Sequence, residues 1–194
     1  DGDLTNTLFQ KGTQPNSAID NSYVFRIYSS SQLALQIADG ASFSNDFGTP
    51  GISSVPENIW THVGIAWDGS QVTYYINGVP TETKAFAVTL ADTTEIASIN
   101  SNSPSVNPYF DGLQDDVRVY NRAITDAEFL ALYEMGEDIG LVGLWRLDET
   151  SGTTAVDSSG NGNDGTMTNG LSGAANSVSG RIDTAINFMP NTND

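Results

Sequence analysis

The sequence predicts an all-β protein, built as an antiparallel two-sheet sandwich with one short helix. Between residues 23 and 119, short segments alternate apolar and polar side chains with period 2 and are rich in β-branched and aromatic residues. Clusters of Gly, Asn, Asp and Pro separate these segments, as turns do between strands. The chain of 194 residues is long enough for one such domain with a substantial core.

Five strands stand out in the first part of the chain. They are Tyr23–Tyr28, Gln32–Ala38, Trp60–Trp67, Gln71–Ile76 and Asp116–Tyr120. Asn77 and Gly78 lie between two apolar runs, and because both tolerate positive φ the pair is the strongest short-range signal of a hairpin. A hairpin is therefore expected over residues 71–83.

One helix is predicted, and it begins at Thr125. Thr125 and Glu128 form a capping box, in which each side chain can bond to the main-chain N–H group of the other. Phe129 and Tyr133 then fall on one face, and Gly136 is a typical C-terminal stop. After this stop the strand pattern resumes.

The C-terminal part predicts two more strands around a long loop. The strands are Leu141–Leu147 and Thr184–Phe188, and the loop, rich in glycine and asparagine, runs from Thr150 to Gly170. Many short strands with a single capped helix favour a sandwich over other all-β folds.

Charge and composition exclude several classes of function. Lys and Arg number 7 against 24 Asp and Glu, for a net charge of -17, whereas nucleic-acid binding needs clustered cations. No apolar run approaches the ~20 residues of a membrane span. We therefore expect no nucleic-acid partner and no membrane insertion.

The composition also indicates where the protein works. The chain has no cysteine, which excludes disulfides, thiolate metal sites and cysteine nucleophiles. It begins at Asp1 without a charged and apolar leader, as a mature secreted chain or a cut fragment would. An acidic, lysine-poor chain made largely of uncharged polar residues is typical of an extracellular or cell-surface β protein.

Three blocks of sequence resemble the laminin-G-like, concanavalin A-like lectin and glucanase family, in its bacterial branch. The first is WTHVGIAWDG at 60–69 with YYING at 74–78, and the second is FDGLQDDVRVYNRAI at 110–124. The third is LWRLDE at 144–149, with GTTA at 152–155, DSSGNGNDG at 157–165 and AINF at 185–188. The resemblance implies a jelly roll of two antiparallel sheets, in a subgroup that decorates large secreted proteins.

The order of these blocks departs from the family. In a family domain the third block comes first and is followed by two further strands, which have no counterpart here. We therefore expect residues 1–136 to be the C-terminal portion of a jelly roll and residues 137–194 to be an N-terminal portion. That second portion belongs to the same permuted domain or to the next repeat or subunit. A sandwich lacking two strands exposes open edges, so pairing between subunits would give a homo-oligomer or polymer.

The sequence does not predict an enzyme. Relatives that hydrolyse β-glucans carry acidic residues two or three apart on one strand, and no such Glu-x-Asp-x-Glu-like run occurs here. His62 is the one histidine, and it lies in a predicted strand without a serine or cysteine nucleophile motif. We interpret it as a structural residue rather than a catalytic or metal-binding one.

Calcium is the expected cofactor, because carboxylate and carbonyl oxygens are the hard ligands that Ca²⁺ prefers. Asp115 and Asp116 are adjacent on a predicted strand, so their side chains point to opposite faces and only one can face a given ion. The resemblance implies Asp115, with further oxygen ligands from the strand that carries Asp148 and from residues 180–183. The metal candidates are therefore Asp115, Asp148 and Asp116. The alternative is that Asp115 pairs with Arg118 or Arg122 or faces solvent.

A second acidic stretch, Asp157-x-Ser159-x-Asn161-Gly162, matches the first half of an EF-hand loop. The match then fails, because the twelfth position is Thr168 instead of a bidentate glutamate. In the family this stretch is a turn in which the aspartate bonds to its own main chain. A turn is therefore favoured, and a metal loop is the alternative.

The aromatic residues are candidates for a sugar platform. They include Trp60, Trp67, Tyr74, Tyr75, Tyr109 and Trp145. Strand alternation sends Tyr74 and Tyr75 to opposite faces, and likewise Trp60 and Trp67, so we expect one of each pair to be buried and the other to face outward.

Loops at strand ends usually carry the binding residues of sandwiches. Residues 43–50 and 100–109 are such loops, which makes Tyr109, Asn107 and Phe47 the candidate ligand-binding residues. For each the alternative is a partly buried anchor of its loop.

We therefore expect a non-catalytic extracellular recognition or adhesion module, stabilised by calcium, whose partner is a carbohydrate or an extracellular protein surface. The alternative is a structural subunit that self-assembles into a polymer or filament by completing a neighbouring subunit's sandwich.

Overall fold

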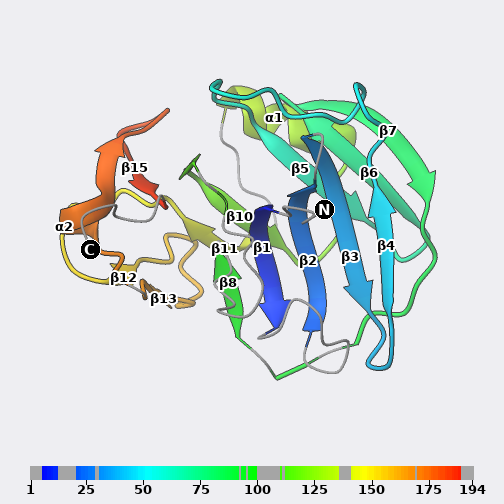
Figure 1. The fold of residues 1–194 in the computed structure, drawn as a ribbon, viewed down its shortest axis with the longest axis horizontal. Coiled ribbons are helices and arrows are strands. Elements are labelled where there is room, and N and C mark those ends of the chain that lie inside the picture. The colour runs from blue at the N-terminus through cyan, green and yellow to red at the C-terminus, as the bar shows by residue number, and fades with distance from the viewer. Residues whose placement is uncertain are drawn as a thin grey trace, which may run out of the picture. The chain divides into compact units, whose positions relative to one another are not determined.

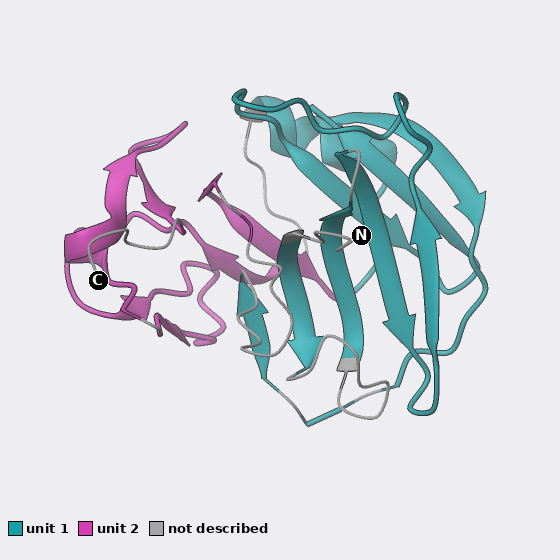
Figure 2. Ribbon diagram, viewed as in Figure 1, with its two compact units in different colours: residues 1–109, 122–138 teal, residues 110–121, 139–194 magenta. Residues whose placement is uncertain are grey.

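The computed structural model of the chain describes residues 6–12, 21–28, 31–91, 93–94, 96–99, 110, 112–135, 141–168 and 170–188. Contacts between residues group the chain into two compact units (Figure 2). Unit 1 comprises residues 1–109 and 122–138, and unit 2 comprises residues 110–121 and 139–194. The expected division of the jelly roll between residues 136 and 137 stays a prediction.

The first sheet of unit 1 has five antiparallel strands in the order β4-β3-β2-β1-β8 (Figure 1). The strands are β1 (Asn6–Gly12), β2 (Asn21–Tyr28), β3 (Gln32–Ala38), β4 (Phe43–Phe47) and β8 (Ala97–Ile99). β2 and β3 were expected at nearly these bounds, because alternating β-branched and aromatic residues suit a pleated surface. β4 forms one end of the sheet and pairs with β3.

The second sheet of unit 1 has the order β5-β6-β7. Its strands are β5 (Val63–Trp67), β6 (Gln71–Ile76) and β7 (Val79–Ala85), so β5 begins three residues later than the predicted Trp60. The expected hairpin is confirmed, since Asn77 (φ 50°) and Gly78 (φ 78°) form the turn between β6 and β7. Both residues adopt the left-handed conformation that a type I′ turn requires.

The two sheets of unit 1 share one apolar core. Leu33, Leu35 and Ile37 of β3 belong to the same buried cluster as Val72 and Tyr74 of β6. Because side chains alternate along a strand, the even-numbered residues of β3 face the other side of the sheet. On this outer face Ala34, Gln36 and Ala38 of β3 are buried, and the exposed side chains are Asn45 and Phe47 of the edge strand β4.

Helix α1 (Asp126–Met135) confirms the predicted capping box. Thr125 N donates to Glu128 Oε2 (2.8 Å), and Glu128 N donates to Thr125 Oγ1 (3.3 Å). The helix buries Phe129, whose ring stacks on that of Tyr75 with 3.9 Å between centroids. The expected stop at Gly136 lies outside the described residues.

Unit 2 consists of short strands and one turn of helix. The strands are β9 (Leu113–Gln114), β10 (Val117–Tyr120), β11 (Leu141–Trp145), β12 (Thr154–Ala155), β13 (Gly165–Thr166), β14 (Ser177–Ser179) and β15 (Thr184–Asn187). β10 pairs with β11, and β15 pairs with both β14 and β9. Residues 113–120 are thus joined by main-chain pairing to strands from the C-terminal part of the sequence.

The all-β prediction is confirmed, with one addition. Helix α2 (Gly173–Asn176) was not expected; it has four residues and is capped by Ser172, whose side chain accepts from Ala175 N. Within the described parts of the chain, no helix is long and apolar enough to cross a membrane.

Candidate functional site

Asp115 and Asp148, two of the three metal candidates, reach the same segment of unit 2. Asp115 Oδ2 accepts a hydrogen bond from Ile182 N (3.4 Å), and Asp148 Oδ1 accepts one from Thr184 N (3.2 Å). Burial raises the pKa of Asp115 to about 6, and the charges of Asp116 and Asp148 act in the same direction. The structure therefore brings these carboxylates close enough to repel each other.

Asp116, the third metal candidate, has a different partner. Its Oδ2 forms an ion pair with Arg118 Nη2 at 2.9 Å. The prediction that Asp115 and Asp116 alternate on one strand is wrong, because β10 begins at Val117 and Asp116 has φ 56°. The chain turns at this point, and alternation applies only within a strand. The arginine pairing considered for Asp115 is observed for Asp116.

Strained backbone surrounds the two carboxylates. Asp116, Leu147 (φ 60°) and Asp183 (φ 53°) are left-handed although none is glycine, and each neighbours a residue of this cluster. Such conformations cost free energy and tend to gather at functional sites. Gly180 also approaches closely, since a Cβ there would lie 2.9 Å from Asp115 Oδ2.

The oxygen atoms around Asp115 and Asp148 meet part of what a calcium site needs. Asp115 and Asp148 supply hard oxygens, and Thr184 Oγ1 is buried with no hydrogen-bond partner among the described residues. Within those residues, no three Asp, Glu, His or Cys side chains converge, so most ligands of a calcium ion would be carbonyl or water oxygens. Arg181 and Ile182, from the segment expected to supply oxygens, instead direct main-chain N–H groups at Asp115.

Asp157 organises a turn, as the favoured interpretation predicted. Its carboxylate accepts from the main-chain N–H groups of Leu144 (3.0 Å), Ser159 (2.9 Å) and Asn163 (2.9 Å). Burial alone would raise the pKa of Asp157, but these hydrogen bonds outweigh it and hold the pKa well below its usual range. The carboxylate is therefore committed to main-chain donors.

His62 and Tyr75 are packing residues. The His62 ring lies 5.5 Å from that of Phe129 and 5.8 Å from that of Tyr133. The expectation that only one of Tyr74 and Tyr75 is buried is wrong, since both are at most 2% exposed. Tyr74 faces the core between the sheets, and helix α1 covers Tyr75 on the opposite face.

The tryptophans also differ in exposure, as expected for Trp60 and Trp67. Trp60 is 39% exposed. Trp67 packs against the core and donates from Nε1 to Phe86 O (2.9 Å). Trp145 of unit 2 donates from Nε1 to Asn163 O (2.9 Å). The last two indoles thus have structural partners.

Phe47 is the predicted ligand-binding residue that the structure describes; Tyr109 and Asn107 lie outside the described residues. Phe47 ends β4 and is 39% exposed. It pairs in register with Ala34 and so projects from the outer face of the sheet, opposite the core. Because Ala34 is small, the ring of Tyr28 reaches across it to that of Phe47, with 4.8 Å between centroids.

Polar groups flank this aromatic pair on the same face. The Arg26 guanidinium donates to Gln36 Oε1, and Gln36 pairs in register with the exposed Asn45. Burial lowers the pKa of Arg26, which sits near the Tyr28 hydroxyl. We call Arg26, Tyr28, Gln36, Asn45 and Phe47 the sheet-face site. Sequence reasoning missed four of them, although polar residues at alternate positions of β2 and β3 were a visible signal.

The main chain around Phe47 is firmly held. Lys84 Nζ donates to Phe47 O (2.6 Å), and Gly48 N donates to Leu33 O (2.8 Å). The next residue, Thr49, donates from both its main-chain N–H and its hydroxyl to Glu82. The exposed ring therefore stands on a rigid edge strand, which reduces the ordering cost of binding.

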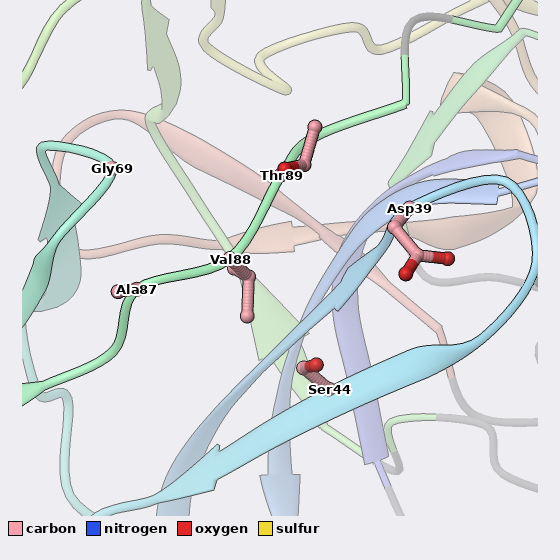
Figure 3. Close-up of a pocket in the computed structure, with 6 residues that line it drawn as sticks. All are labelled: Asp39, Ser44, Gly69, Ala87, Val88 and Thr89. Carbon is pink, nitrogen blue, oxygen red and sulfur yellow. The ribbon is translucent and has the colours of Figure 1, made fainter.

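A separate pocket of about 500 Å³ opens at one end of the sandwich of unit 1 (Figure 3). It lies where the β3–β4 hairpin, the β5–β6 turn and the segment after β7 meet. Its lining residues are Asp39, Ser44, Gly69, Ala87, Val88 and Thr89. We call it the hairpin-end pocket. Nothing in the sequence motifs singled it out, because its three segments meet only in the folded chain.

Comparison with known proteins places this chain in a family. No curated protein matches it. Among solved structures, a candidate carbohydrate-binding protein from Bacteroides ovatus matches with a TM-score of 0.62 and 19% identity. The match covers 87% of this chain but half of the length of that protein. A heptameric SAP-like pentraxin from Limulus polyphemus matches with a TM-score of 0.44 and 18% identity. This match covers 68% of this chain and 64% of the pentraxin chain. The family model of the concanavalin A-like lectin and glucanase superfamily matches residues 2–129, and the chain belongs to that superfamily.

Proposed function

We propose that this protein is a non-catalytic glycan-binding module of the extracellular space, and that the sheet-face site holds the sugar. The observation that carries the proposal is the aromatic pair of Tyr28 and Phe47 beside the hydrogen-bonded Arg26 and Gln36. An exposed ring offers an apolar face to the C–H side of a pyranose. The exposed amide of Asn45 next to it can bind hydroxyls, and the buried Gln36 and the partly buried Arg26 hold the strands beneath.

Family membership supports this assignment without fixing it. The superfamily includes both lectins and glucanases, and a fold of this kind hosts many activities. The matched protein of Bacteroides ovatus is itself a candidate carbohydrate-binding protein. In the sheet-face site the charged side chain is Arg26, and a retaining or inverting glycosidase needs two carboxyl groups around the sugar bond. The site is thus suited to binding.

Binding calorimetry with glycans selected on an array tests the proposal. Phe47→Ala is expected to weaken binding about tenfold through the loss of stacking. Ile52→Ala removes an exposed apolar side chain from a loop of the same unit and serves as the matched control, with unchanged affinity. Failure of every glycan to bind, or equal affinities for the wild type and Phe47→Ala, would contradict the proposal.

We also propose that calcium binds at Asp115 and Asp148 and stabilises unit 2. Two adjacent carboxylates that repel each other gain from a shared cation. Calcium at millimolar concentration should raise the melting temperature of the wild type relative to chelator, because an ion that binds only the folded state stabilises it by mass action. Asp115→Asn should remove that increase and should not be less stable than the wild type in chelator.

The pairing inside unit 2 favours self-assembly as a second candidate function. β10 pairs with β11 and β9 pairs with β15, so strands far apart in the sequence complete each other. The same pairing between two copies would exchange the C-terminal strands and build a dimer or a chain. Light scattering after size exclusion, in calcium and in chelator, is the test. A single species of 20.6 kDa at all concentrations would rule this candidate out.

A further inference from the structure

The hairpin-end pocket is a built feature of unit 1, because hydrogen bonds fix each of its walls. Phe86 N donates to Ser70 O (2.7 Å), and Ala91 N donates to Ala38 O (2.8 Å). The segment between residues 86 and 91 is therefore tied at one end to the β5–β6 turn and at the other to the end of β3. Val88, in the middle of this segment, packs against the core.

The middle of that segment lines the pocket and has main-chain groups without a hydrogen-bond partner among the described residues. Among the described residues, the main-chain groups of Ala87, Val88 and Thr89 have no hydrogen-bond partner, and neither do the hydroxyls of Ser44 and Thr89. Main-chain N–H and C=O groups without a protein partner must bind water or a ligand. Figure 3 shows that the side chains of Asp39, Ser44 and Val88 come from different segments around one space.

Asp39 supplies a fixed acceptor at the rim. Its Oδ1 accepts from Ala41 N (2.8 Å) and Ser42 N (2.7 Å), and its Oδ2 accepts from Ser42 Oγ (3.0 Å). These donors hold the pKa of Asp39 below its usual value, so the group is ionised at neutral pH. A carboxylate has about four acceptor positions, so Oδ2 retains capacity for a ligand hydroxyl.

We infer that the hairpin-end pocket is a second sugar-binding site, and that it takes the hydroxyl-bearing end of a neutral glycan while rejecting uronic acids and sulfated sugars. Its lining combines the hydroxyl-bearing side chains of Ser44 and Thr89 with the apolar side chains of Ala87 and Val88, which suits a neutral polyhydroxylated ring. An acidic sugar would meet the Asp39 carboxylate and the field of a chain with net charge -17.

This inference rests on the proposed function for its ligand class but on different residues, so the two can fail separately. The test is a titration of the ¹⁵N-labelled full chain followed by NMR. The probes are the methyl glycosides of glucose, galactose and mannose and the corresponding uronic acids, at constant ionic strength. At least one neutral glycoside should shift the amide signals of residues 87–89 and of the β3–β4 hairpin. Its uronic acid should bind about tenfold more weakly or not at all.

Two variants and one control test whether the pocket residues cause the shifts and the preference for neutral sugars. Asp39→Asn keeps an oxygen for the hairpin N–H groups but removes the charge, and should reduce the preference for the neutral sugar at least threefold. Val88→Trp should fill the pocket and abolish the shifts, with a melting curve confirming that it folds. Asp68→Asn is the matched control, because Asp68 makes the same kind of turn with Ser70 N (2.8 Å) and Gln71 N (2.7 Å) but does not line the pocket.

The outcomes distinguish the pocket from the sheet-face site. Shifts confined to residues 26–28, 36 and 45–47 would overturn the inference and leave the proposed function intact. Equal affinity for neutral and acidic sugars, or equal effects of Asp39→Asn and Asp68→Asn, would also overturn it. If no probe and no array glycan shifts any signal, both the inference and the proposed function fail.

Discussion

Asp157 and Asp115 are acidic side chains whose surroundings shift their pKa values in opposite directions. Asp157 accepts hydrogen bonds from several main-chain N–H groups, which favour its charged form. Asp115 is partly buried beside two other carboxylates, which disfavours its charged form. Hydrogen bonds to main-chain donors thus mark the first as structural, and like charges nearby mark the second as a candidate cation ligand.

Replacing Asp157 should therefore destabilise unit 2. Asp157→Ala leaves the main-chain N–H groups of Leu144, Ser159 and Asn163 without their acceptor and should lower the free energy of unfolding by at least about 2 kcal/mol. Asp157→Asn retains one acceptor oxygen and should lose less. Urea denaturation measures both. Equal stability of wild type and Asp157→Ala would show that the turn does not depend on this carboxylate.

Glu128 predicts a pH dependence of helix α1. Hydrogen bonds from Arg122, then from Thr125, lower the pKa of Glu128 from its usual value to about 2. Because the folded-state pKa is depressed, the contribution of Glu128 to stability is present above about pH 4.5 and is lost as the pH falls through about 2.

The difference in stability between wild type and Glu128→Gln should therefore be largest above pH 5 and disappear near pH 2. Urea titrations of the two proteins across this range measure it. A difference that does not change with pH would contradict the assignment of the ion pair with Arg122 as its source.

At the scale of elements, one glycine sets how helix α1 packs on unit 1. Gly64 of β5 lies directly beneath the ring of Phe129, and a Cβ at this position would come within 1.9 Å of Phe129 Cζ. On the neighbouring strand β6, Tyr75 stacks on the same ring and donates from its hydroxyl to Asp126 Oδ1 (2.7 Å). The helix thus needs a strand residue without a side chain.

Gly64→Ala should consequently destabilise the protein by about 1–3 kcal/mol, because the extra methyl group forces Phe129 out of place. The double variant Gly64→Ala/Phe129→Leu should be less destabilised than the sum of its single variants, since the smaller side chain makes room. Chemical denaturation of the four proteins completes the cycle. Additive effects would show that the two residues do not share one packing contact.

Elements that depend on near neighbours were predictable, and contacts between distant elements were not. Asn77-Gly78 and the capping box of Thr125 and Glu128 were predicted because a turn or a cap is decided within a few residues. The burial of Tyr75 was missed because helix α1, more than fifty residues further along, covers it. The left-handed conformation of Asp116 was missed because strand alternation was assumed to continue through it.

At the scale of the whole molecule, the order of the blocks has a structural counterpart. Residues 110–121, which make up most of the second block, belong to the same compact unit as the C-terminal residues 139–194. Ile186 pairs with Gln114, and Trp145 pairs with Val117. Strands that the sequence separates by more than twenty residues therefore complete one unit through main-chain hydrogen bonds.

Removal of residues 137–194 should leave β9 and β10 without these partners. The shortened chain should associate or lose the melting transition of the full chain, because unpaired strand edges and uncovered apolar surface are exposed. Light scattering and thermal melts measure both effects. A shortened chain that stays monomeric and melts at the temperature of the full chain would show that unit 2 contributes little to the stability of the rest.

The site itself could be predicted only in part. Phe47 was a candidate because residues 43–50 were expected to be a loop; that expectation is wrong for residues 43–47, which form β4. The register adds Arg26, Tyr28 and Gln36 by placing them on the same outer face. Sequence alone could not pair these residues, since the order of strands in a sheet is decided by tertiary packing. The hairpin-end pocket likewise depends on three separate segments that meet in the folded chain.

Hydrogen–deuterium exchange of the full chain with and without a glycan identified on the array tests the central claim most directly. Binding at the sheet-face site should slow exchange in peptides that cover β2, β3 and β4, because a ligand stabilises the strands that hold Arg26, Gln36 and Phe47. The same glycan should give no such protection in Phe47→Ala. If the wild type binds the glycan but these strands show no protection, the binding site lies elsewhere. That result would contradict the proposed sheet-face site.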